Sequence, residues 1–455
     1  MSGRPRCGTP GRRTTERQAT VGGPPWPLPV SLLATAAVAQ IAGASALVVA
    51  APDLARGVYY GPAQLGAVHL VGVAFLTVAI VAALLQLVPV LLRTPVGRPV
   101  RTGIAAGALA AGSWGLAIGL WLARDGLIAT GGTLLVLGGA VIVGDLTAAL
   151  ARAGRAGTLS ASGAGLAAST VWLALVLGLG GLMAANRIDP FLEVDRLRLM
   201  AAHAAIAIVG WIGGTIIAIA LRLAPMFALS HGYRRGPGVV ALVLWHASVA
   251  PIAIGLGLGR PELAAAGGAL LLGACLAACW FVVDVARHRR RRPEAPLVHL
   301  GLGLTAAGSA VALMLTAWAG PGDPRRAAIP ATILAVVGLG AGVTSGHMFK
   351  VVPMLVWTGR YAHLAGTPGA PRLSDLYPAP LAAVEAAAFA AGLALLTGGV
   401  AAGAPLVARA GALLLVVAAA AVASAVAVVV LRRRGGPPLT APATSPFRPL
   451  TGGMT

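Results

Sequence analysis

The stretch HLVGVAFLTVAIVAALLQLVPVLL, residues 69–92, is almost entirely apolar. Its polar exceptions are a histidine at its start, a threonine, and a glutamine that precedes a proline near its end. About 20 such residues suffice for a helix to cross the roughly 30 Å hydrocarbon layer of a bilayer. A helix also satisfies its own backbone hydrogen bonds, which lipid cannot do. The stretch is therefore predicted to be a membrane-spanning helix.

The whole chain has the composition of an integral membrane protein. Of its 455 residues, 58% are hydrophobic and only 10% are charged, with a mean hydropathy of +0.86, which is far from that of a soluble domain. We predict an all-α polytopic fold within residues 28–434, with disordered tails at 1–27 and 435–455. Its twelve predicted spans lie near 30–50, 64–88, 101–122, 127–150, 162–185, 199–224, 238–258, 262–286, 296–319, 328–353, 380–400 and 405–431.

Basic residues are distributed unevenly along this sequence. The 34 Lys and Arg residues outnumber the 13 Asp and Glu residues, for a net charge of +21. Most of them fall in the tails and in the loops that follow even-numbered spans, including the run Arg289 to Arg292. The positive-inside rule then predicts that both termini are cytoplasmic, in a bacterial inner membrane. We expect the basic loops to contact anionic lipid headgroups rather than nucleic acid.

The end of the quoted stretch recurs twice in the chain. LLQLVPVLL is matched by ALRLAPMFAL and MFKVVPMLVW, and the polar residues Gln86, Arg222 and Lys350 are spaced by 136 and then 128 residues. This period equals four spans, so we predict three four-helix units; chance recurrence of proline near helix ends is the alternative. The first span could be mistaken for a signal peptide, but its removal would break this repeat. Lys350 is interpreted as an anchor that reaches the headgroups rather than as a substrate-binding cation.

Five of the eight histidines fall within predicted spans: His69, His203, His246, His299 and His347. His69 and His203 follow the outer ends of their spans by a few residues, so at 1.5 Å per residue both imidazoles are expected roughly 6–8 Å below the outer boundary. Neutral imidazole binds haem iron or copper without bringing a charge into the membrane. The alternative for each histidine is a hydrogen bond to a neighbouring helix.

This arrangement resembles subunit I of the haem-copper oxidases, including their nitric oxide reductase relatives. The shared features are three four-helix arcs and histidines in the second, sixth, seventh and tenth spans. The sequence HAAIAIVGWIGGTIIAIALRLAP followed by LSHGYRR is also similar to the NnrS membrane proteins, which contain haem and copper and are linked to nitric oxide stress. The resemblance implies that His69 is a low-spin haem ligand, that His203 and His246 bind metal or haem, and that His347 is the ligand of the tenth span.

The chain departs from the oxidase pattern in its tenth and seventh spans. The tenth has one histidine instead of two, the seventh has no paired histidines, and no tyrosine follows His246 as a cross-linked redox group. We therefore expect no complete binuclear centre, and whether the protein is an oxidoreductase stays open.

Acidic residues and cysteines within the spans are assigned structural roles. Asp145, Asp284 and Glu385 are interpreted as interfacial or interhelical carboxylates, because a proton-pumping oxidase would need a longer polar relay. The three cysteines cannot form a disulfide framework. Cys275 and Cys279 share a helix face and are interpreted as packing residues rather than as a copper or thiol site.

Three functions fit these features. The first is binding of haem, or of haem and copper, in electron transfer or nitric oxide metabolism with a respiratory partner. The second is transport of a small solute or ion along a path lined by Gln86, Arg222, Lys350, His347 and Asp145. The third is an assembly role for a protein that kept the fold without a cofactor. Transporters built from repeats mostly have twofold symmetry, which favours the first.

Overall fold

The computed structural model describes residues 24–320, 323–367 and 370–432, and within these ranges twelve helices are long and apolar enough to cross a membrane. The predicted all-α polytopic fold is confirmed; the predicted tails lie outside the described residues, apart from 24–27. The spans are α1 (Pro27–Ala55), α2–η1–α3 (Pro62–Leu92), α4 (Pro99–Trp121), α5 (Asp125–Arg155), α6 (Ala161–Ile188), α7–η2–α8 (Arg196–Ala228), α9 (Gly236–Leu258), α10 (Pro261–Arg287), α11 (Ala295–Ala319), α12–η3–α13 (Pro324–Arg360), α14 (Ala379–Ala401) and α15 (Pro405–Leu431).

Proline marks the start of half of these spans, as at Pro27, Pro99 and Pro261. The first residues of a helix have no carbonyl partner for their N–H groups, and proline has no N–H and a preset φ, so it is favoured there. Glycine and the short loops reverse the chain at the other ends. Each span therefore returns directly beside the previous one, in an up-and-down arrangement.

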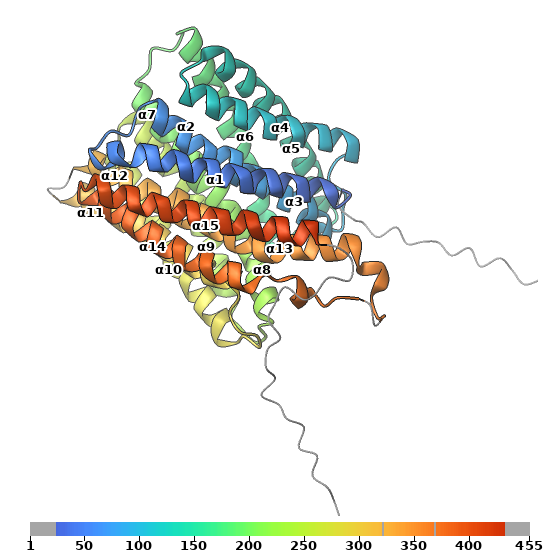
Figure 1. The fold of residues 1–455 in the computed structure, drawn as a ribbon. Coiled ribbons are helices and arrows are strands. Elements are labelled where there is room, and N and C mark those ends of the chain that lie inside the picture. The colour runs from blue at the N-terminus through green and yellow to red at the C-terminus, as the bar shows by residue number, and fades with distance from the viewer. Residues whose placement is uncertain (1–23, 321–322, 368–369, 433–455) are drawn as a thin grey trace, which may run out of the picture.

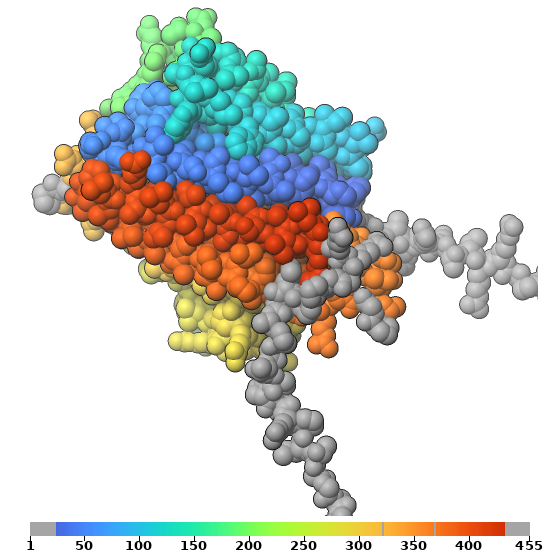
Figure 2. Space-filling model, in the orientation of Figure 1, coloured from blue at the N-terminus to red at the C-terminus, as the bar shows by residue number. Residues whose placement is uncertain are grey.

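Both described ends of the chain lie on one side of the bundle (Figure 1). The Arg360 guanidinium lies 5.1 Å from the centroid of the Trp26 ring, and Arg360 donates a hydrogen bond to the carbonyl oxygen of Arg432 at 3.3 Å. We call this the terminal side, which the charge distribution predicts to be cytoplasmic, and the opposite one the far side. α1 and α15 run side by side along one face of the molecule (Figure 2).

Three spans contain eight-residue π-helical segments in their middle. These are η1 (Leu70–Thr77), η2 (Ile206–Gly213) and η3 (Leu334–Ala341), and they begin 136 and 128 residues apart, which is the spacing predicted from the sequence repeat. A π-helix is rare, because its i→i+5 hydrogen bonds widen the helix, and it occurs frequently at functional sites. The repeat therefore has a structural counterpart.

The three π segments meet at the centre of the bundle. Leu76, Ile212 and Gly340 occupy the same position in each unit, and a Cβ on Gly340 would lie 2.7 Å from Leu76 Cδ1 and 3.5 Å from Ile212 Cγ2. Equivalent residues from three units can converge only near an axis that relates the units. The central spans thus surround a pseudo-threefold axis, and the other nine spans pack around them.

The second copy of the repeat ends in a strained residue on the terminal side. Leu229, which follows α8, has a left-handed backbone with φ of 50°, and Arg93 has φ of 51° at the matching position of the first unit. This conformation costs a non-glycine residue about 1–2 kcal/mol.

We expect Leu229→Gly to raise the free energy of unfolding by about 0.5–1 kcal/mol, measured by denaturant titration of the solubilised protein. Met226→Gly, inside the helix, should lower it; a loss of stability in Leu229→Gly would contradict the argument.

Candidate functional site

The structure brings His69 and His203 together on the far-side half of the central spans. His69 is the last residue of α2, and His203 lies in α7, three residues before η2. Trp211 Nε1 donates a hydrogen bond to Thr77 Oγ1 at 3.1 Å, and each of these residues follows its histidine by eight positions. The two imidazoles therefore lie at similar height above a shared cross-link, and they are within electrostatic range of each other.

Each histidine of this pair has a ring nitrogen with no hydrogen-bond partner among the described residues. His69 Nδ1 lies 2.7 Å from the carbonyl oxygen of Leu65, so its N–H donates there and Nε2 keeps its lone pair. His203 Nδ1 is buried and has no hydrogen-bond partner. No heavy atom lies within 4 Å of the position that a Cβ would take on Gly72, one turn beyond His69. Open space thus lies beside η1 at Gly72.

His246 occupies a separate place. Its Nδ1 accepts a hydrogen bond from Trp172 Nε1 at 3.3 Å, and its Nε2 is buried without a partner. The ring packs at Gly214, where an added Cβ would lie 2.6 Å from His246 Cε1. Gly214 follows His203 by eleven residues on the same span, roughly 16 Å at helical rise. The two histidines that the resemblance assigns to metal binding thus lie at different depths.

His347 lies on the terminal-side half of the tenth span. Its Nδ1 is 2.7 Å from the carbonyl oxygen of Val343, and its ring centroid is 6.0 Å from that of Phe227. By the repeat spacing, the position that matches His69 on this span is Ile333, fourteen residues earlier, which corresponds to roughly 21 Å. A cofactor bound by His69 is therefore out of reach of His347.

The other polar residues predicted along the repeat have local surroundings of their own. Gln86 Nε2 donates to the carbonyl oxygen of Pro24 at 2.7 Å. Lys350 forms a salt bridge with Glu294, just before α11, so it has a carboxylate partner as well as the expected position near the interface. Arg222 is exposed, and its side chain has no hydrogen bond or ion pair with the described residues. These three side chains do not converge on one path.

The acidic residues have the interhelical or interfacial partners that the sequence predicts. Asp145, on α5, pairs with Arg101 and accepts a hydrogen bond from Thr102 Oγ1 at 2.7 Å, both from α4. Asp284 accepts a hydrogen bond from the Arg234 backbone N–H at 2.6 Å. These carboxylates connect neighbouring spans at the terminal side.

Sequence reasoning named His299 and Glu385 separately but missed that they pair. His299 Nε2 on α11 lies 2.8 Å from Glu385 Oε2 on α14, and the two side chains are 1% and 0% exposed. The distance fits an ion pair, although the alignment falls outside hydrogen-bond geometry. Both residues lie a few positions after the terminal-side start of their spans. Their matched depth could have been predicted from the sequence. The sequence does not show, however, that the two helices present these residues to each other.

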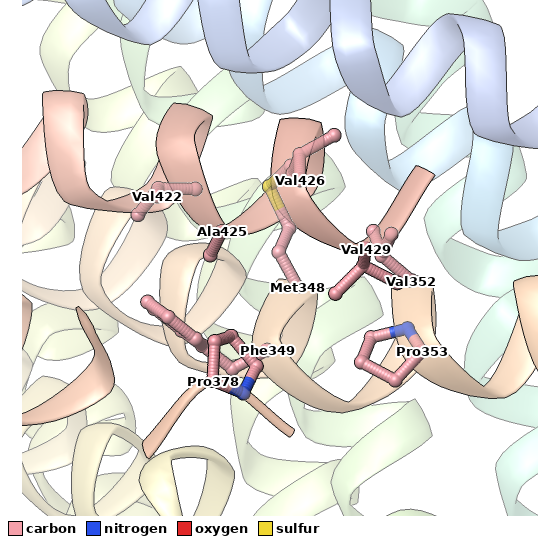
Figure 3. A pocket seen from close by; sticks show the side chains of 9 residues that line it. All are labelled: Met348, Phe349, Val352, Pro353, Pro378, Val422, Ala425, Val426 and Val429. Atoms are coloured by element: carbon pink, nitrogen blue, oxygen red, sulfur yellow. The ribbon is translucent and has the colours of Figure 1, made fainter. Parts of the chain in front are cut away.

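Two small hollows among the described residues lie away from this histidine pair. One lies between α13 and α15 and is apolar, with Phe349 and Pro353 facing Val426 (Figure 3). A second lies among α8, α9, α10 and α11 and is apolar too. No histidine lines either of them. Among the described residues no group of three or more His, Cys, Asp or Glu could hold a metal ion.

Comparison with known proteins assigns no family. Neither a protein-family model nor a curated protein matches this sequence. The structure supports a multi-pass integral membrane protein associated with a lipid bilayer. Any narrower function has to be inferred from its side chains.

Proposed function

We propose that the protein binds a haem through His69 and His203 and acts in electron transfer or nitric oxide metabolism in a bacterial inner membrane. One observation carries the proposal: two imidazoles from adjacent central spans lie at the same height, and neither Nε2 has a partner among the described residues. Two imidazoles suffice for a six-coordinate haem. The lack of a three-ligand group therefore does not bear on this site.

The surroundings of the pair suit this role. Donation of the His69 Nδ1–H to the Leu65 carbonyl fixes the tautomer and the ring orientation, as second-shell partners do for metal-binding histidines. The buried Nδ1 of His203 lacks a partner, which is costly unless a ligand, a water or a proton donor satisfies it. Open space at Gly72, three residues beyond His69, leaves room for part of a ligand beside this span.

Residues around the pair hold it in place and exclude water. The Trp211–Thr77 hydrogen bond sets the distance between the two spans that carry the histidines. Phe75 and Trp211, which follow the histidines on the same two spans, are almost fully buried. When bound, haem would supply a one-electron redox centre whose potential depends on its ligands and burial.

Absorption spectroscopy of the protein purified from a haem-replete host tests the proposal. We expect a Soret band in the wild type, and haem content at least about tenfold lower in His69→Ala and His203→Ala, since loss of a ligand should exceed a second-shell effect. His347→Ala, on the other half of the membrane, and His288→Ala, beyond α10, should keep the band. A wild-type protein with neither Soret band nor iron overturns the proposal.

The alternatives have less support. A copper site at His203 and His246 would need ligands from different depths. Transport would need a common path, whereas Gln86, Lys350 and Asp145 each have a local partner. Uptake or efflux of one solute that depends on Lys350, in a protein without a chromophore, would favour transport instead.

A further inference from the structure

A buried ionisable pair on the terminal-side half has no role in the proposed haem site. His299 and Glu385 are 1% and 0% exposed, and their facing atoms Nε2 and Oε2 are 2.8 Å apart. The remaining polar atoms, His299 Nδ1 and Glu385 Oε1, are buried without a partner. Apolar residues of similar volume are often no less stable than such a pair. Ionisable groups inside a membrane are therefore functional candidates by default.

The pair can hold a proton with no net charge. With one proton between Nε2 and Oε2, it is either imidazolium and carboxylate or imidazole and carboxylic acid, and both forms are neutral overall. Loss of that proton leaves a carboxylate beside neutral imidazole. Gain of a second leaves imidazolium beside a carboxylic acid. Each charged form is costly in an apolar environment unless a compensating charge lies nearby.

Charged and titratable groups surround the pair on its terminal side. Glu294 and Lys350 form a salt bridge there, and His347 of α13 is within electrostatic range of His299. The Tyr377 hydroxyl accepts a hydrogen bond from the Ala295 backbone N–H at 3.4 Å. Burial raises the pKa of Tyr377, and nearby Glu294 and Glu385 raise it further, so the hydroxyl keeps its proton at neutral pH.

The pair is closed toward the membrane centre. The Phe389 ring, one turn further along α14, lies 5.3 Å from that of His299. On α13, Gly342 and Gly346 pack directly on His299. A Cβ added to Gly342 would lie 3.6 Å from Nδ1 of His299, and a Cβ added to Gly346 would lie 2.7 Å from Cβ of His299. Phe389 and the α13 backbone thus cover the His299 ring on these sides.

We propose that His299 and Glu385 form a proton-binding site that exchanges its proton with the terminal side of the membrane by way of Tyr377 and the Glu294–Lys350 pair. The transfer moves one proton between Tyr377 or an intervening water and the His299–Glu385 pair, with no bond to carbon and no electron transferred. The site does not depend on a bound haem.

Infrared difference spectroscopy of the full-length protein between acidic and alkaline pH tests the proton site. We expect the carboxyl and imidazole bands to change together in one titration. Glu385→Gln should remove both, and His299→Gln should leave a carboxylate with a different titration midpoint. Glu262→Gln, an exposed residue at the start of α10, is the matched control and should change neither band. Bands that persist in Glu385→Gln, or an absence of titration, overturn the proposal.

The direction of exchange is tested in proteoliposomes of known orientation. After a pH jump on the terminal side, the bands of the wild type should respond, and a jump on the far side alone should give no fast response. Tyr377→Phe and Lys350→Met should slow the response at least about tenfold while keeping the bands. Equal response from both sides, or unchanged rates in both variants, contradicts the route. These variants also test the proposal if Glu385→Gln fails to fold, and none of the readouts requires haem.

Discussion

Glu385→Ala is expected to lower the free energy of unfolding by about 3–5 kcal/mol, because it leaves the imidazole of His299 buried without its partner and also opens a cavity. Both side chains are essentially inaccessible, so water cannot replace the lost carboxylate without disturbing the packing of α11 on α14. The measurement is denaturant unfolding of the solubilised protein. Glu193→Ala, at an exposed loop position before α7, should change stability by less than about 0.5 kcal/mol.

A double substitution separates pairing from packing. His299→Leu combined with Glu385→Leu removes both ionisable groups at once and should recover most of the stability, because well-packed apolar residues replace buried ion pairs at little or no cost. The same protein should have lost the proton-binding bands. If the double variant is as unstable as Glu385→Ala, or if Glu385→Ala is as stable as the wild type, the two side chains do not act as one buried unit.

The features that sequence predicts well here are local ones. Hydropathy identifies each span, because a bilayer imposes a minimum apolar length on every helix, and the observed bounds differ from the predicted ones by a few residues. Counting along the chain also placed His69 and His203 near the far side. The repeat of Gln86, Arg222 and Lys350 anticipated the spacing of the π segments, since equivalent spans place equivalent residues at equal depth.

Counting residues along the chain does not predict how each helix is rotated about its axis or which side chains pair with each other. The apolar residues of η1 fit an α-helix as well as a π-helix. The packing of the three central spans therefore selects the π-helix, which is the wider of the two. The contact between Lys350 and Glu294 joins residues 56 apart, and that between His299 and Glu385 joins two different spans. Which side of a helix faces a neighbour is set by the whole bundle. The sequence therefore predicts how deep in the membrane a site lies better than it predicts which residues form that site.

Close backbone contact holds the outer helix pairs of each unit together. A Cβ on Gly131 of α5 would lie 2.3 Å from the backbone nitrogen of Leu116 on α4, and one on Gly411 of α15 would lie 2.2 Å from that of Leu396 on α14. Likewise a Cβ on Gly255 of α9 would lie 2.4 Å from the nitrogen of Ala264. Lipid provides no hydrophobic drive between helices, so such close packing supplies much of their association.

Gly131→Val is expected to destabilise the protein by about 2–3 kcal/mol or more, the upper end of overpacking effects, because the obstacle is backbone, which cannot rotate away as a side chain can. The adjacent Gly132→Val is a matched control, since no heavy atom lies within 4 Å of its added Cβ; it should change stability by less than about 0.5 kcal/mol. On α14, Gly399→Val should likewise destabilise the protein, whereas the adjacent Gly398→Val should change stability little. Denaturant unfolding measures all four. Equal effects at neighbouring glycines would mean that α4 and α5 separate at little cost, and that their stability comes from elsewhere in the bundle.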